Sequence, residues 1–288
     1  MKAIYKRELN SYFHTMIGYV FIAFLVAYTG IYFMAYNLNY GYPYFSYVLS
    51  GVLFVLLIAV PVLTMRSFAE ERKNKTDQLL LTSPVSVGRI VLGKYLAMVT
   101  ILAVPCVIYL IFPLIIKAQG TAYILTDYLS ILLFFLLGCV YISIGLFLSS
   151  LTESTIIAAI STVGILVALY LWSGILEFLP AGAGGNAVGI VLILSLLVLG
   201  LWQMTKNWLF SAAAEVLAAA GTLAVYLIKP ELFENLLSEI LGKLELTEYL
   251  TSITQNSYLD LGGIILYLSL IVIFLFLTVQ MIQKRRWS

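Results

Sequence analysis

Residues 65–95, MRSFAEERKNKTDQLLLTSPVSVGRIVLGKY, form the one long charged segment in a chain that is otherwise mostly apolar. Apolar runs flank this segment on both sides, at 45–62 and at 96–116. The segment carries six basic residues, which are Arg66, Arg72, Lys73, Lys75, Arg89 and Lys94. Because Lys and Arg gather in the cytoplasmic loops of membrane proteins, the segment is predicted to lie on the cytoplasmic side of a membrane.

The composition excludes an ordinary soluble domain. The 288-residue chain is 62% hydrophobic and 10% charged, whereas soluble domains are about half apolar and about a quarter charged. A transmembrane helix needs about 20 apolar residues. Runs of this kind occur at 17–36, 45–65, 95–116, 128–151, 155–179, 188–204, 208–228 and 261–281. We therefore expect an all-α integral membrane protein with about eight transmembrane helices. The net charge of +2 is too small to indicate nucleic acid as a partner.

The positions of the basic residues predict the topology. Of the 16 Lys and Arg residues, only Lys117, Lys229 and Lys243 fall on the predicted outer side. This bias is expected when both termini are cytoplasmic. It supports an even number of spans more firmly than it supports eight, because losing both spans within 188–228 would leave the two termini on the same side.

Within the charged segment, the sequence predicts a helix over 68–81. Glu70 and Glu71 precede lysines by three and four residues, spacings at which opposite charges stabilise a helix. The helix should end at 82–84, because the residue before a proline avoids helical geometry. A charged helix with an apolar end at 79–81 suits docking onto a soluble partner, and a solvated loop that only sets topology is the alternative.

Four segments carry a family resemblance. They are FAEERKNKTDQLLLTSPVSVGRIVLGKYLA at 68–97, KREL with Tyr12 and Phe13 near the N-terminus, GLFLSSLTEST at 145–155 and FLFLTVQMIQKRRWS at 274–288. Together they resemble bacterial ABC-2-type exporter permeases, in particular the gliding-motility-type subfamily. Two positions depart from the family pattern: Lys75 stands where a glycine is common, and Gln78 where a glutamate is common.

The resemblance implies a single transmembrane permease domain over 1–288. Its six-span core would carry an inserted helical hairpin at 188–228 and a cytoplasmic coupling loop at 66–94. An N-terminal amphipathic elbow helix is expected at 1–15. A further amphipathic helix is expected on the extracellular side within 230–260, where apolar residues recur at helical spacing.

The resemblance also implies partners. These are two copies of a cytoplasmic ABC ATPase subunit and a second permease subunit that is identical or related. Apart from the resemblance, the lipid bilayer of the bacterial cytoplasmic membrane is an expected partner, and an extracytoplasmic accessory protein is a candidate partner. ATP and Mg²⁺ would bind to the ATPase and no cofactor to this chain, which would move an unidentified substrate outward. The expected ATPase-coupling contacts are Phe68, Glu70, Glu71, Arg72, Leu79, Leu80 and Leu81.

Two other functions remain open at this point. One is a non-transporting membrane anchor or mechanotransmitter, in which ATPase strokes act on an extracytoplasmic partner through 230–260. The other is a secondary transporter that needs no ATPase, which paired intramembrane charges or repeated broken helices would favour.

Residue types that carry chemistry are sparse in this sequence. Glu215 is the one carboxylate clearly inside a predicted span, where it should face protein or water; it could line a substrate path or bond to a neighbouring helix. The motif GRIVLGK at 88–94 fits a P-loop up to its lysine, but Tyr95 stands where Ser or Thr must ligate magnesium. Cys106 and Cys139 are read as packing residues. The sequence therefore predicts no catalytic, cofactor-binding or metal site, and no enzyme activity of this chain.

Overall fold

The computed structural model describes residues 1–77, 85–205, 208–256 and 260–287. All regular structure in these residues is helical. Contacts divide the chain into two compact units, unit 1 with Met1–Tyr170 and Leu246–Ser288, and unit 2 with Leu171–Glu245. The expectation of a single permease domain stays a prediction, because compactness alone does not test function.

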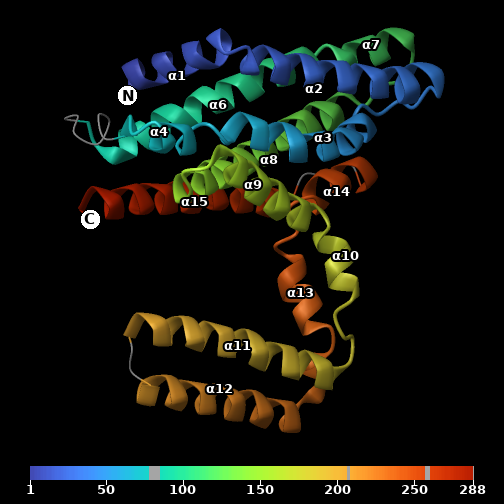
Figure 1. Ribbon diagram of the computed structural model, residues 1–288. Coiled ribbons are helices and arrows are strands. Elements are labelled where there is room, and N and C mark those ends of the chain that lie inside the picture. The colour runs from blue at the N-terminus through green and yellow to red at the C-terminus, as the bar shows by residue number, and fades with distance from the viewer. Residues whose placement is uncertain (78–84, 206–207, 257–259, 288) are drawn as a thin grey trace. The chain divides into compact units, whose positions relative to one another are not determined.

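Unit 1 is a bundle of long apolar helices around α8 (Figure 1). Helix α8 packs against α3, α6, α9 and α15, and it is the most deeply buried of the long helices. In chain order the helices are α1 (Lys2–His14), α2 (Ile17–Phe33), the π-helix η1 (Met34–Asn39), α3 (Ser46–Thr64), α4 (Ala69–Lys73), α6 (Val87–Tyr109), α7 (Phe112–Gln119), α8 (Ile124–Leu151), α9 (Thr155–Tyr170), α14 (Glu248–Asn256) and α15 (Leu261–Trp287).

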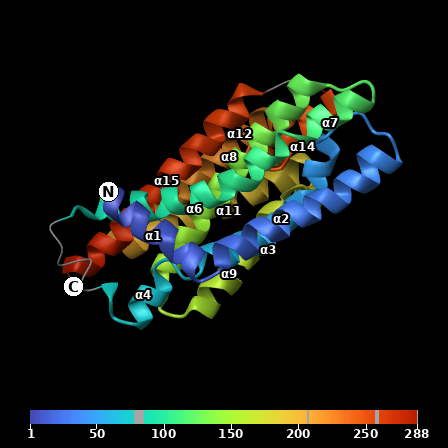
Figure 2. The ribbon, with the colours of Figure 1, turned by 90° about the horizontal axis from the view of Figure 1, so that it is seen from above.

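Both chain termini lie at the same end of unit 1 as α4, whereas α7 and α14 lie at the opposite end (Figures 1 and 2). We call the first of these, formed by α1, α4 and the end of α15, the inner end. Arg285 of α15 lies 3.9 Å from Asp77, which follows α4. The basic segments that were predicted to share one side of the membrane therefore meet at one end of the bundle.

Five helical stretches in the described residues are long and apolar enough to cross a membrane. They are Ile17–Asn39, Ser46–Lys73, Val87–Gln119, Ile124–Leu151 and Leu261–Arg285. Helix α9 has only 16 residues, or about 24 Å of length, against about 30 Å of hydrocarbon. The predicted continuous span over 155–179 is wrong, because the helix is interrupted at Leu171 before α10 (Trp172–Glu177). The total of eight spans stays a prediction.

Helix α8 also holds the start of α3 at the outer end. The Asp127 carboxylate accepts hydrogen bonds from the backbone N–H groups of Phe45, at 2.8 Å, and Ser46, at 3.2 Å. The first N–H groups of a helix have no partner within the helix. A carboxylate from a neighbouring helix therefore caps the N-terminus of α3, as the side chain of an N-cap residue would.

Unit 2 contains α10, α11 (Ala183–Thr205), α12 (Trp208–Ile228), η2 (Pro230–Phe233) and α13 (Leu236–Gly242). Helices α11 and α12 pack against each other and fall in the region where the hairpin was predicted. The Asn186 side chain links the start of α11 to α13, because its Oδ1 accepts a hydrogen bond from the Leu237 N–H at 3.1 Å. Its Nδ2 donates to the carbonyl of Pro180, which precedes α11, at 2.6 Å.

The predicted amphipathic helix within 230–260 is not continuous. The chain forms the short helices η2, α13 and α14 there, the last of them in unit 1. Asn235, with a φ of 56°, separates η2 from α13. The apolar spacing indicated helix correctly, but it did not show where the helix stops.

We expect Gly145→Ala to destabilise unit 1. A Cβ at Gly145 of α8 would lie 2.9 Å from Cβ of Thr64 on α3, and overpacking of this kind costs about 1–3 kcal/mol. Thermal unfolding in detergent should show a lower Tm. The control is Gly164→Ala on α9, where an added Cβ meets nothing within 4 Å. Equal Tm values for the two variants would contradict the close packing of α3 and α8.

Candidate functional site

The charged segment forms a short helix within a polar network at the inner end of unit 1. Helix α4 covers only Ala69–Lys73 and ends at Asn74. The predicted continuous helix over 68–81 is therefore wrong, because Lys75 adopts a left-handed φ of 56°. Glycine is the residue that takes this conformation without strain, and glycine is the residue that the family resemblance led us to expect at this position. Leu79, Leu80 and Leu81 lie outside the described residues.

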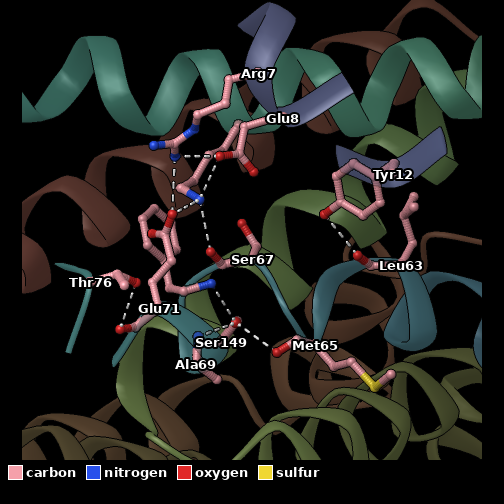
Figure 3. A network of polar contacts seen from close by, with 12 residues as sticks. Arg7, Glu8, Tyr12, Leu63, Met65, Ser67, Ala69, Glu71, Thr76 and Ser149 are labelled. Carbon is pink, nitrogen blue, oxygen red and sulfur yellow. Dashed lines mark hydrogen bonds and ion pairs between the residues drawn. The ribbon is translucent and has the colours of Figure 1, made fainter. Parts of the chain in front are cut away.

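Ser149 at the end of α8 holds the start of α4 (Figure 3). Its hydroxyl oxygen accepts hydrogen bonds from the N–H groups of Phe68, at 3.1 Å, and Ala69, at 3.2 Å. The same hydroxyl donates to the Met65 carbonyl at 3.2 Å. One serine thus uses its donor and both of its acceptor positions to fix where α4 begins.

Arg72 joins α4 to the turn between α8 and α9. Its guanidinium donates to the Ser150 carbonyl and to the Glu153 carboxylate, each at 3.1 Å. Glu153 also lies 3.5 Å from Arg285 near the end of α15. The segment GLFLSSLTEST, singled out in the sequence, therefore supplies three contacts to α4 and the residues before it: Ser149, Ser150 and Glu153.

Lys94 of α6 lies at the centre of the network and is only 1% exposed. Its ammonium lies 2.9 Å from the Glu71 carboxylate, 3.2 Å from the Glu8 carboxylate and 2.9 Å from the Ser67 carbonyl. A buried charge is tolerated only where it is paired and hydrogen-bonded. Lys94 thereby links α6 to α1 through Glu8 and to α4 through Glu71.

Arg7 of α1 adds a second cation to the same pair of carboxylates. In Figure 3 Arg7 and Glu8 point toward Glu71, and the Arg7 guanidinium lies 2.6 Å from Glu8 and 3.1 Å from Glu71. Burial acts to lower the pKa of Arg7, but the two carboxylates outweigh it and raise that pKa. Two cations therefore balance two carboxylates. We call Arg7, Glu8, Glu71 and Lys94 the inner-end network.

Close packing of α1 on α6 and α3 supports the network. A Cβ at Gly93 would lie 3.1 Å from the Ile4 side chain, so a glycine beside Lys94 lets α1 approach. The Tyr12 hydroxyl donates to the Leu63 carbonyl at 3.0 Å. Burial raises the pKa of Tyr12, and the phenol therefore remains a neutral donor at physiological pH.

The predicted coupling residues within the described region face two ways. Phe68 is 7% exposed and its ring centroid lies 5.1 Å from the Lys94 ammonium. Glu71 and Arg72 also turn toward the bundle. Glu70 is 45% exposed and lies 3.8 Å from Arg66. None of these contacts tests the coupling role, which stays a prediction for all four residues.

Sequence reasoning missed the roles of Glu8, Lys94, Ser149 and Glu153. Glu8 and Lys94 looked like ordinary interfacial charges, because their partner Glu71 is distant in sequence. One feature of the sequence could have pointed to Ser149 and Glu153: both are polar residues at the end of an apolar run, within the segment at 145–155 that the family resemblance already singled out. Their contacts with α4 required knowledge of which helices pack together.

Two other sequence candidates lie elsewhere. Gly88–Lys94 forms part of helix α6, so its N–H groups beyond the first turn are engaged within the helix and do not form a phosphate-binding loop. Glu215 lies in α12 of unit 2 and is partly exposed. Its role stays a prediction. Among the residues that the structure describes, no group of His, Cys, Asp and Glu could hold a metal ion.

The fold and this site define a class: a multi-pass helical membrane protein with a short charged helix anchored at one end. The sequence model of the family described as "ABC-2 family transporter protein" matches residues 36–228. This match covers well over half of the chain, and the chain belongs to that family. It is a transmembrane permease component of an ABC transporter, and membership implies association with an ABC ATPase. Neither a curated protein nor a solved structure matches the chain.

We expect Ser149→Ala to destabilise α4. The change leaves the N–H groups of Phe68 and Ala69 without their acceptor, and the loss of a cap costs about 1–2 kcal/mol. The matched control is Ser143→Ala on the same helix, because the Ser143 hydroxyl donates only to the nearby Val140 carbonyl. Limited proteolysis near α4 and the Tm should both change for Ser149→Ala. The same cleavage rate for both variants would argue against the cap.

We expect Lys94→Met to be strongly destabilising, by about 3–5 kcal/mol, because it leaves buried carboxylates without their main cation. Adding Glu71→Gln should restore part of the lost Tm, because it removes one of the unpaired charges. The exposed Lys73→Met serves as the control. No recovery in the double variant would show that Lys94 acts through its packing and not through its charge.

Proposed function

We propose that this chain is the transmembrane permease subunit of an ABC exporter of the gliding-motility type in a bacterial cytoplasmic membrane. Both termini would be cytoplasmic. Two copies of a separate ATPase subunit, which bind ATP and Mg²⁺, would provide the energy to move a substrate across the membrane. A second permease subunit, identical or related, would complete the complex.

The anchoring of α4 is the observation that best supports this proposal. The helix has five residues, too few to be stable alone. Nevertheless it is held by α8 through Ser149, by α6 and α1 through Glu71, and by the α8–α9 turn through Arg72. A force applied to α4 would therefore reach several long helices at once.

The directions in which the side chains of Phe68 and α4 point support a surface on α4 for contact with the ATPase. Phe68, Glu71 and Arg72 are engaged with the bundle, whereas the Glu70 side chain is 45% exposed and Lys73 is exposed. An ATPase would bind the exposed residues, and the engaged residues would transmit its movement. Helix α1 would move together with α4, because Glu8 and Glu71 share the same lysine.

The test is charge reversal on the exposed face of α4, Glu70→Lys with Lys73→Glu, which keeps the net charge and the inner-end network. The full chain is co-expressed with the ABC ATPase subunit of the same organism and purified under gentle conditions. We expect the wild type to retain the ATPase and the variant to lose most of it. The control is Glu239→Lys with Lys243→Glu, an exposed pair on α13 of unit 2 that lies 3.9 Å apart.

Three outcomes would count against the proposal. Undiminished ATPase retention by the α4 variant would show that α4 is not the contact surface. Failure of the wild-type chain to bind the ATPase, together with unchanged ATP turnover, would overturn the subunit assignment. If the complex hydrolyses ATP but moves no candidate substrate in proteoliposomes, the export part of the proposal fails and mechanical transmission becomes the better assignment.

A further inference from the structure

A polar cleft of about 340 Å³ lies beside the inner-end network, between α1 and the residues around α4. Its charged lining consists of three basic and three acidic side chains, Arg7, Arg66, Lys94, Glu8, Glu70 and Glu71. Sites for anionic lipid headgroups are clusters of Lys and Arg. These six side chains pair with one another, so the lining carries no net charge. A headgroup with one positive and one negative charge matches such a lining better than an anionic headgroup does.

An apolar groove of about 260 Å³ adjoins this cleft. Thr15 and Ile17 line both cavities. The remaining lining comes from the turn between α1 and α2, from α2 and from α3, and includes Phe21, Phe24 and Val62. Met16, with a φ of 60°, turns the chain between α1 and α2. The cleft at the inner end is thus continued by an apolar groove along two membrane-crossing helices.

Two polar atoms of residues in the cleft wall lack a hydrogen-bond partner among the described residues. They are the Ser67 hydroxyl and Oε2 of Glu71, both buried. A buried polar group without a partner is unfavourable by about 1–3 kcal/mol. Ser67 is 4% exposed, so bulk water does not reach its hydroxyl freely, and a ligand in the cleft would complement these two atoms only after the side chains of the wall turn toward it.

We propose that the cleft and the groove together bind one phospholipid with a zwitterionic, amine-bearing headgroup. Its ammonium would face Glu70 and Glu71, and its phosphate would face Arg66 and Arg7. One acyl chain would lie in the groove against Phe21, Phe24 and Val62. The position of the basic residues puts the cleft at the level of the inner-leaflet headgroups. This inference does not depend on an ATPase, so it can fail or stand separately from the proposed function.

The first test is native mass spectrometry of the full chain, released from nanodiscs that contain equal amounts of phosphatidylethanolamine, phosphatidylcholine and phosphatidylglycerol. We expect retained phosphatidylethanolamine to exceed each of the others by about tenfold, the change that one charge-assisted hydrogen bond produces. Phosphatidylcholine has the same charges but no N–H donor, and phosphatidylglycerol has no cation. Equal retention of the three lipids would overturn the headgroup assignment.

Matched variants test the two cavities separately. Val62→Trp should fill the groove and lower lipid retention about tenfold. The control is Val107→Trp on α6, which lies outside the groove and should leave lipid retention unchanged. Both variants should fold, because Val62 is 42% exposed and Val107 is 62% exposed. Arg66→Gln should lower retention, with Lys73→Gln as its control. Soluble glycerophosphoethanolamine should compete poorly. Equal loss in Val62→Trp and Val107→Trp, or competition by the soluble headgroup at lipid-like concentrations, would overturn the proposal.

Discussion

The arrangement of unit 1 depends on the need of helix N-termini for hydrogen-bond acceptors. Helix α8 provides acceptors at both of its ends, with Asp127 at the start of α3 and Ser149 at the start of α4. Each acceptor satisfies two backbone N–H groups that have no partner in their own helix. In an apolar environment an unmet N–H group is costly, so these two side chains fix where the neighbouring helices begin. Because α8 is also the most buried long helix, the positions of α3 and α4 follow from it.

Buried charge determines the rest of the site. Lys94 is buried within the bundle, where Glu8 and Glu71 approach its ammonium from two different helices and Arg7 balances the second carboxylate. Replacing such a pair by apolar residues is often neutral or stabilising, so the network is weak evidence for stability. Its main effect is on geometry, because the same two carboxylates join α1 and α4 to Lys94 of α6. This is the property that a force-transmitting contact needs.

The proposed lipid site lies in the same region. The proposed coupling surface on α4 and the proposed lipid cleft share Glu70, which lines the cleft. A phospholipid headgroup in the cleft would therefore contact the segment that an ATPase would push. The proposed function and the proposed lipid site thus depend on one local geometry, although each has its own test.

The sequence by itself determined the class of the protein. Apolar runs of membrane length required helices, the distribution of Lys and Arg placed both termini at one end, and the segments at 68–97 and 145–155 pointed to the ABC-2 family. Hydrophobicity and charge bias are sums over neighbouring residues, and they can be read without a fold. Tertiary structure decided that α4 ends where Lys75 turns, that α9 stops before Leu171, and that Glu71 pairs with Lys94 and not with Lys75. The pair of Glu71 and Lys94 depends on a partner far away in the chain, and only the packing of the helices brings the two side chains within hydrogen-bonding distance. The turn at Lys75 and the end of α9 are backbone conformations that sums of hydrophobicity and charge do not report.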